Sequence, residues 1–288
     1  MFENDQRDIR GALARIRSVY SSLAPAERKV ADVILEQYEK AIYLSVTQLA
    51  ETSGVGESTV IRFCQNAGFR GYQELKLVLA RDLVDPSENL SEGVSVDDTL
   101  ESIVRKVGYT NSRSIDDTIK LLDIRALDMA VNWLLDARRI QFYGVGQSGV
   151  TALDAKYRFM RLGLICDALT DSHVQMMSAA TLDSRDLAVG ISFSGSTIDV
   201  VEAIDKAKER GARTMCITAY ARSPLAKASD IKLIAASSET PLGSGSLRSK
   251  ITQLLVLDLL YTVAALRLGD KGRLYTELVA ESVLHKLY

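Results

Sequence analysis

The sequence predicts two folded parts, an all-helical N-terminal domain followed by an α/β domain built on a parallel sheet. Residues 8–82 carry apolar residues at helical spacing and no strand pattern. Beyond residue 136, short apolar runs alternate with amphipathic helices, which is typical of a parallel sheet covered on both faces. With 288 residues, of which 47% are hydrophobic, the chain has enough apolar material for two cores.

The N-terminal part is expected to be a series of helices. The first carries Ile9, Leu13 and Ile16 on one face, and the second begins at Pro25, because proline suits the first turn of a helix. Shorter helices are expected at about 46–53, 57–67 and 71–83. A polar stretch with proline and glycine then lacks periodicity and predicts a linker. We therefore expect a helical domain at 1–84, a linker at 85–97 and a second domain at 98–288, which includes its preceding helix.

Five apolar runs are the candidate strands of the second domain. They cover Ile140–Tyr143, Leu164–Ala168, Leu187–Ser192, Thr214–Thr218 and Ile231–Ala235. A helical run from Asp97 to about Asp136 precedes them, and helices fill the intervals. Ligands of such sheets bind beyond the carboxyl ends of the strands. Two glycine- or serine-rich turns, 144–149 and 192–197, follow such ends and are therefore candidate ligand sites.

Residues 46–63 have the spacing of a helix-turn-helix. Ala50 is small where two helices would touch, and Gly54 can take the left-handed conformation that the turn needs. Glu57 at the start of the second helix is expected to cap that helix or orient a neighbour. The net charge of −2 means that DNA contact must come from a local patch. The candidate DNA contacts are Ser58, Thr59, Arg62 and Gln65 on the outward side, with Asn66 beside them and the basic residues Arg70 and Lys76.

The turn Ser192-Phe193-Ser194-Gly195-Ser196-Thr197 lies between a predicted strand and a predicted helix. Free backbone N–H groups, the helix dipole and several hydroxyls would converge there on an anion such as a phosphate. Earlier in the chain, Gly144, Gly146 and Gly149 form a G-x-G-x-x-G in which Ser148 offers a further hydroxyl. That motif alone also fits a dinucleotide-binding turn, with Asp167 holding a ribose. The second, hydroxyl-lined turn favours a phosphate ligand.

These motifs together resemble those of RpiR-type transcriptional regulators. Ser192-x-Ser194-Gly195-x-Thr197 is similar to the phosphosugar signature of SIS (sugar isomerase) domains, and Gly144-x-Gly146-x-Ser148 to their first glycine turn. The similarity spans nearly the whole chain, including residues 25–31 and 68–76. The resemblance implies a five-stranded flavodoxin-like sheet, double-stranded operator DNA, a phosphorylated sugar or amino-sugar effector, and a homodimer or homotetramer. The effector contacts that it implies are Gly144, Gly146, Ser148, Ser192, Ser194, Gly195, Ser196, Thr197 and Glu239.

Catalysis is not expected. Isomerases with this domain place a glutamate base after the fifth strand, where Glu239 lies, and Glu239 and Arg248 are candidate sugar contacts. His173 is expected either to border the site or to cap a helix, and His285 to be exposed. We expect a repressor of carbohydrate-metabolism genes that uses no cofactor. An NAD(H)-sensing repressor and a sugar-phosphate isomerase with an accessory DNA-binding domain stay open as alternatives.

Three further features concern the compartment and the assembly. The scattered Cys64, Cys166 and Cys216 lack metal spacing and are expected to be reduced core residues. The apolar stretch Ile251–Leu266 is expected to be too short to cross a bilayer and to lie in either a subunit interface or the core. The acidic start Met1–Asp8 does not suit a secretory leader. We therefore expect a cytoplasmic protein without a membrane partner.

Overall fold

The structure is a computed structural model that describes residues 11–83, 94–236 and 248–286. The chain divides into two compact units, of which the described residues are 11–83 and 94–111 in the first and 112–236 and 248–286 in the second. Helix α7 runs from Leu100 to Leu121.

The described part of the first unit before residue 84 is all helical, as predicted. Its elements are α1 (Ala12–Val19), the 3-10 turn η1 (Tyr20–Ser22), α2 (Pro25–Glu36), α3 (Tyr38–Ala41), α4 (Val46–Thr52), α5 (Glu57–Asn66) and α6 (Tyr72–Leu83). Pro25 occupies the first turn of α2, where its missing N–H breaks no helical hydrogen bond. Ile16, Ile34, Leu49, Phe63 and Leu75 are fully buried, one each from α1, α2, α4, α5 and α6. The helices are thus held around one apolar core.

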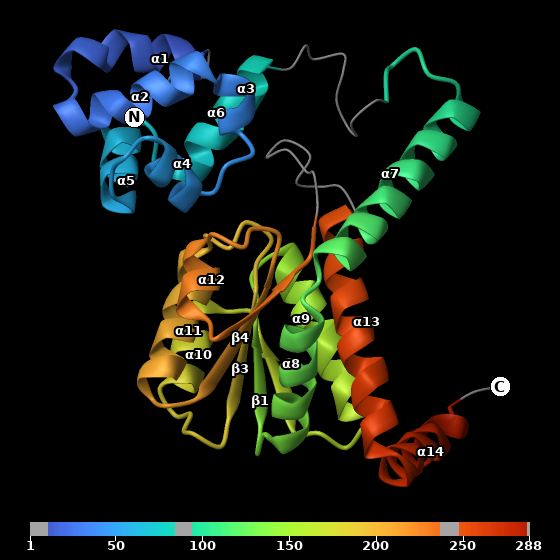
Figure 1. The fold of residues 1–288 in the computed structure, drawn as a ribbon. Helices are drawn as coiled ribbons and strands as arrows, with labels where there is room; N and C mark the ends of the chain where they lie inside the picture. Colours follow the sequence, from blue (N-terminus) through green and yellow to red (C-terminus); the bar gives the residue numbers. More distant parts are fainter. Residues whose placement is uncertain (1–10, 84–93, 237–247, 287–288) are drawn as a thin grey trace, which may run out of the picture. The chain divides into compact units, whose positions relative to one another are not determined.

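The second unit has three layers, with a parallel sheet between two layers of helices (Figure 1). The strands are β1 (Ile140–Tyr143), β2 (Cys166–Leu169), β3 (Leu187–Ile191), β4 (Arg213–Thr218) and β5 (Ile231–Ile234). The helices are α8 (Ile124–Asp136), α9 (Gln147–Met160), α10 (Ser172–Ala179), α11 (Ile198–Glu209), α12 (Pro224–Ala228), α13 (Arg248–Leu268) and α14 (Asp270–Leu284). The strand order β2-β1-β3-β4-β5 is that of flavodoxin-like folds, so the predicted fold class is confirmed.

Burial on both faces of the sheet explains the nearly continuous apolar runs of its strands. In β3, Leu187, Val189 and Ile191 pack with α8, α9 and α13, whereas Ala188 faces α10, α11 and α12. Helices α8, α9 and α13 lie on one face in Figure 1, and α10, α11 and α12 on the other. Gly190 leaves no room for a side chain, because an added Cβ would lie 2.9 Å from Leu225 Cδ1. Alternate residues therefore serve two different helical layers.

Helix α13 corrects one expectation from the sequence. By length and composition alone, Ser249–Leu268 is long and apolar enough to cross a membrane, so the prediction that this stretch is too short was wrong. In the structure its residues Val256, Leu257, Leu260 and Ala264 are buried in the sheet core, and the helix packs against α8 and α9. Only 33% of the apolar window is buried, so core burial accounts for part of its composition, and a single such helix is weak evidence for a membrane span.

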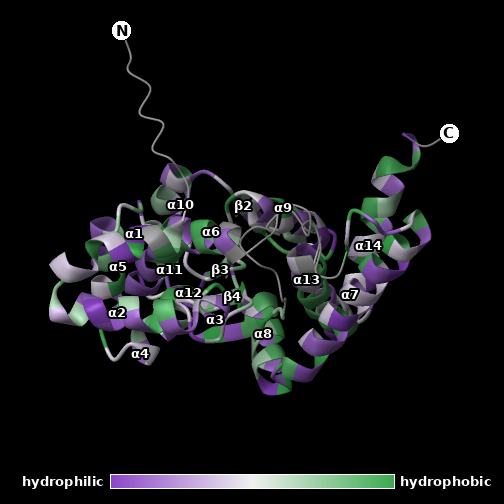
Figure 2. Cartoon of the chain, turned by 90° about the horizontal axis from the view of Figure 1, so that it is seen from above, coloured by the Kyte–Doolittle hydropathy of each residue, from purple (hydrophilic) through white to green (hydrophobic). Residues whose placement is uncertain are grey.

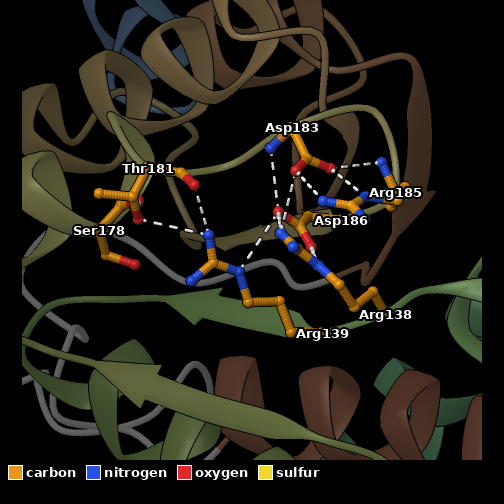
Figure 3. Close-up of polar contacts among 7 residues, drawn as sticks. All are labelled: Arg138, Arg139, Ser178, Thr181, Asp183, Arg185 and Asp186. Atoms are coloured by element: carbon orange, nitrogen blue, oxygen red, sulfur yellow. Dashed lines mark hydrogen bonds and ion pairs between the residues drawn. The ribbon is translucent and has the colours of Figure 1, made fainter.

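An arginine–aspartate network joins the amino ends of β1 and β3 (Figure 3). Arg138 donates from Nε and Nη2 to the two carboxylate oxygens of Asp186, at 2.9 and 2.7 Å, and Arg139 Nε lies 3.3 Å from the same carboxylate. Burial alone would raise the pKa of Asp186, but hydrogen bonds from Arg138 and from the Asp183 backbone hold that pKa below its usual range. The network lies at the end of the sheet opposite to the two candidate turns, so we interpret it as structural.

Candidate functional site

The predicted helix-turn-helix is formed by α4 and α5. Gly54 has φ +63° and an added Cβ would meet no atom within 4 Å, so the left-handed backbone, and not space, requires glycine there. Ala50 is almost fully buried, and its carbonyl accepts a hydrogen bond from the N–H of Val55 at 2.9 Å. Thr47 Oγ1 donates to Glu57 Oε1 at 2.6 Å, which ties α4 to the first turn of α5. Glu57 therefore orients a neighbouring helix, one of the two roles expected for it.

The outward face of α5 carries most of the predicted DNA contacts. Val60, Phe63 and Cys64 point into the core. The side chains left at the surface are those of Ser58, Arg62, Gln65 and Asn66, with Thr59 half-buried. Ile61 is also 37% exposed on this helix, although the sequence pattern did not indicate it as a DNA contact. An apolar side chain there suits the methyl group of thymine.

Arg62 has an intramolecular partner that the sequence did not reveal. Its Nε donates to Glu27 Oε1 at 2.6 Å, and Asn66 Nδ2 donates to both Glu27 oxygens at 3.1 Å. Glu27 belongs to α2 and its side chain is 2% exposed, whereas that of Arg62 is 59% exposed. The two residues are 35 positions apart, so no local spacing could predict the contact.

Lys76 is a correction to the predicted DNA contacts. Its side chain is buried, and Nζ donates to the carbonyl of Leu44 at 2.9 Å and lies 5.6 Å from the ring centre of Tyr72. Burial lowers the pKa of Lys76 to about 8. A lysine held in this way stabilises the chain before α4 instead of reaching DNA. Arg70 is exposed and remains a candidate phosphate contact.

The turn after β3 is shaped by its own hydroxyls. Ser192 is buried, its Oγ accepts a hydrogen bond from the N–H of Gly195 at 3.2 Å, and its hydroxyl and that of Thr197 are hydrogen bonded at 2.9 Å. Ser194 Oγ accepts from the N–H of Ser196 at 3.2 Å. Thr197 is the N-cap of α11. Ser192 therefore orders the turn from a buried position, while Ser194, Ser196 and Thr197 are partly exposed.

Gly195 allows this turn to sit close to the chain after β4. Its φ is +60°, and an added Cβ would lie 2.2 Å from Ser223 Oγ and 2.8 Å from Thr218 Oγ1. Both of those side chains are fully buried, and the carbonyl of Gly195 accepts a hydrogen bond from the N–H of Leu225 at 2.9 Å. Glycine is thus needed here both for its backbone conformation and for space.

The glycine turn after β1 lies beside the turn after β3, because the two strands are paired neighbours with Tyr143 opposite Gly190. An added Cβ at Gly144 would lie 2.6 Å from the Ser148 carbonyl, and Gly146 has φ +59°. Ser148 Oγ accepts a hydrogen bond from Gln253 Nε2 at 3.3 Å. Gln253 is a buried residue of α13, a contact that the sequence did not predict. Together the two turns place hydroxyls and the N-termini of α9 and α11 at one edge of the sheet, an arrangement suited to an anion.

The remaining candidates are placed as follows. Glu239 lies outside the described residues. His173 is exposed as the second residue of α10, whose N-cap is Asp171, so His173 does not cap that helix. Asp167 lies within β2 and not at its end, and its Oδ1 accepts from Lys156 Nζ at 2.6 Å. It does not hold the position of a ribose-binding carboxylate.

The cysteines agree in part with expectation. All three are free thiols, and Cys64 and Cys216 are fully buried, with burial raising the pKa of each to about 12. Cys166 is only half-buried. High thiol pKa values leave little thiolate for reaction at neutral pH.

Two parts of the chain match known protein families. Residues 10–86 match the family model described as helix-turn-helix domain, rpiR family, and residues 133–263 match the SIS domain. HexR, an HTH-type transcriptional regulator of Pseudomonas aeruginosa, is 39% identical over 285 residues, which cover 97% of this chain and 98% of HexR. The chain belongs to the RpiR family. It is a helix-turn-helix transcriptional regulator with a SIS domain.

A further relative and two solved structures are also similar to this chain. An uncharacterized HTH-type transcriptional regulator of Caldanaerobacter subterraneus subsp. tengcongensis is 42% identical over 253 residues, 88% of this chain and 90% of its own. The structure of Vibrio vulnificus NanR complexed with ManNAc-6P has a TM-score of 0.84 and 30% identity, and covers 96% of this chain and 100% of its own. The sugar isomerase domain of an RpiR transcription factor from Sphaerobacter thermophilus has a TM-score of 0.58 and 26% identity, and covers 62% of this chain and 98% of its own.

Proposed function

We propose that this RpiR-family regulator binds a phosphorylated sugar or amino-sugar at the turns 144–149 and 192–197, and that binding changes its affinity for operator DNA. The observation that carries the proposal is the adjacency of the two turns. Ser148, Ser194, Ser196 and Thr197 offer hydroxyls beside the N-termini of two helices. NanR, at 30% identity over nearly the whole chain, has been solved with ManNAc-6P, which is a ligand of this chemistry. Glu239 is kept as a candidate sugar contact.

DNA binding is assigned to the domain at residues 1–84, and effector binding to the domain at 98–288. The contacts proposed for the operator are Ser58, Thr59, Arg62 and Gln65 on α5, with Arg70 as a phosphate contact. Side chains at the exposed face of a second helix can reach base edges in the major groove. We infer that the protein is a repressor of carbohydrate-metabolism genes that the effector releases from DNA.

The chain is proposed to act without catalysis and without a cofactor. Three relatives that are 39% to 42% identical to the chain are named transcriptional regulators. An NAD(H)-sensing repressor is disfavoured, because Asp167 is already paired with Lys156 and lies inside a strand. An isomerase needs a base and a partner that opens the sugar ring. His173 is the nearest described histidine in sequence to the turns, and no hydrogen bond links it to them in the described structure.

We further propose a cytoplasmic homo-oligomer, either a dimer or a tetramer. Val150, Leu153, Tyr157 and Met160 recur on one face of α9 and are 36% to 59% exposed. Apolar and polar stretches also alternate along α14 in Figure 2, and Leu274 and Leu278 are about half exposed there. Monomeric proteins rarely leave such surfaces uncovered. A two-fold assembly would present two copies of α5 to a palindromic operator.

A thermal-shift series tests the effector proposal. The full chain would be heated with glucose 6-phosphate, fructose 6-phosphate, glucosamine 6-phosphate and N-acetylmannosamine 6-phosphate, each paired with its unphosphorylated sugar. A ligand at about 100 times its Kd stabilises the folded state by about 2.7 kcal/mol, which corresponds to a Tm increase of about 5 to 10 °C for a unit of this size. At least one phosphorylated member should give this shift while its unphosphorylated partner does not. Equal shifts within every pair would contradict the phosphate site.

A further inference from the structure

Glu27 is a buried carboxylate in the N-terminal unit that lies below the proposed DNA-reading surface. It is the third residue of α2, and its side chain is 2% exposed. A buried carboxylate is unfavourable unless charged or hydrogen-bonding groups compensate it. Two of its partners belong to α5, the helix that carries the proposed base contacts. Glu27 is too buried to contact DNA itself, but it is hydrogen bonded directly to α5, the helix proposed to contact DNA.

The geometry at Glu27 holds one edge of the Arg62 guanidinium. Arg62 Nε donates to Oε1 at 2.6 Å, Asn66 Nδ2 donates to both oxygens at 3.1 Å, and the N–H of Ala24 donates to Oε2 at 3.2 Å. Burial on its own would raise the pKa of Glu27, but the hydrogen bonds from Arg62, Asn66 and Ala24 outweigh it and lower that pKa. The carboxylate is therefore ionised at neutral pH, when its attraction for Arg62 is strongest.

The other end of Arg62 is directed to the surface. Its side chain is 59% exposed although Nε is engaged, so the exposed portion includes the Nη end. A guanidinium carries donors on Nη1 and Nη2 in a planar fork. In the major groove, the partner that fits such a fork is guanine, which offers O6 and N7 as adjacent acceptors. Lysine has no fork and could not contact Glu27 and a base in this way.

We propose that Glu27 is a positioning residue for DNA recognition, which fixes Arg62 by its Nε so that the two Nη groups are presented to a guanine of the operator. The inference rests on the proposed DNA-binding function. Without Glu27, Arg62 would have to be immobilised during binding, and the side-chain entropy of an arginine corresponds to a factor on the order of ten in affinity. The loss should fall on discrimination at one base pair, because phosphate contacts do not depend on sequence.

The test uses the full chain and a duplex that the wild-type protein selects from a pool of randomised DNA. Affinity is measured for this duplex, for each of its single base-pair variants, and for a random-sequence duplex, with wild type, Glu27→Gln, Arg62→Ala and Arg62→Lys. Asp32→Asn is the matched control, since Asp32 lies on the same helix, accepts a hydrogen bond from Tyr20, and its substitution removes the same charge.

We expect Arg62→Ala and Arg62→Lys to lose discrimination of about 5- to 150-fold at one G·C pair of each half-site. Glu27→Gln should lose discrimination at that same pair by about 3- to 10-fold, and bind the random-sequence duplex as Asp32→Asn does. The double variant Glu27→Gln/Arg62→Ala should discriminate no worse than Arg62→Ala alone.

Several results would overturn the inference. Wild-type discrimination in Glu27→Gln would show that Glu27 does not act through Arg62, and equal weakening on every duplex would show a structural role only. Should Glu27→Gln fail to fold by circular dichroism, Arg62→Lys is measured in its place, after circular dichroism has established that it folds without the Nε donor to Glu27. Retained preference at every G·C pair then refutes the proposal. If the wild type selects no duplex at all, the proposed DNA-binding function fails instead.

Discussion

Replacing Gly195 by alanine should weaken the second unit by an amount that the structure allows us to work out. The left-handed backbone at φ +60° costs an alanine about 1 to 2 kcal/mol. Its Cβ would lie 2.2 Å from Ser223 Oγ and 2.8 Å from Thr218 Oγ1, and both side chains are fully buried. Overpacking of this kind costs about 1 to 3 kcal/mol. The sum is about 2 to 5 kcal/mol of unfolding free energy.

The assay is urea unfolding followed by tryptophan fluorescence. The sequence contains one tryptophan, Trp133 in α8, so the signal reports on the second unit. Gly211→Ala is the matched control, because Gly211 has φ +85° but no atom within 4 Å of an added Cβ, and it should lose only about 1 to 2 kcal/mol. Equal destabilisation by the two substitutions would refute the steric argument. Gly195→Ala should also reduce the thermal shift given by a phosphorylated sugar, whereas Gly211→Ala should not.

Three other variants, one of them a double substitution, test separate parts of the molecule. Ser194→Ala with Thr197→Ala should abolish the thermal shift given by phosphorylated sugars and leave affinity for the selected duplex unchanged; a normal shift would contradict the site. Because burial lowers the pKa of Lys76 to about 8 from 10.5, the unfolded chain binds more protons between these values, and stability should rise with pH across that window. Lys76→Met should remove this rise. A Tm difference between Lys76→Met and wild type that stays constant from about pH 7.5 to about pH 10.5 would contradict the lowered pKa of Lys76. Asp186→Asn should cost about 2 to 3 kcal/mol at about pH 7 in Trp133-monitored unfolding. Since the Asp186 pKa is lowered, that cost should shrink as the pH falls below the usual carboxyl range; a cost unchanged down to about pH 2 would contradict it.

The strands could be predicted from the sequence where both sheet faces are covered. Ile140–Tyr143 was predicted with the bounds that β1 has, because its residues are all buried. The second strand was predicted at Leu164–Ala168 but is Cys166–Leu169. As an edge strand it is only half-buried, so its apolar pattern is weak, and the neighbouring residues Leu164 and Ile165 extended the apparent run.

The candidate site was predictable where local pattern determines geometry. Gly54 has the left-handed backbone expected for its turn, and hydroxyls follow β3 as expected, whereas the left-handed backbone of Gly195 is a finding of the structure. Contacts between distant segments were not predictable. Nothing near Arg62 in the sequence indicates Glu27, and nothing near Ser148 indicates Gln253.

Burial also changes what a side chain can do. Lys76 was grouped with the basic surface residues because a helix pattern does not show that its ammonium group donates a hydrogen bond to the distant Leu44 carbonyl. Ser192, a candidate phosphate contact, also has hydrogen bonds within its own turn that the sequence pattern did not show. For Lys76, a contact between distant segments, and not the residue type, determines the role.

The most direct test of the account is whether a phosphorylated sugar controls DNA binding. Fluorescence anisotropy of the selected duplex would be measured with increasing protein, in the presence of each phosphorylated sugar that gives a thermal shift and of its unphosphorylated partner. We expect the phosphorylated form to weaken DNA affinity by about 5- to 150-fold, the usual range of allosteric coupling, and the unphosphorylated form to have no effect. Tight binding of the duplex that no phosphorylated sugar alters would contradict it.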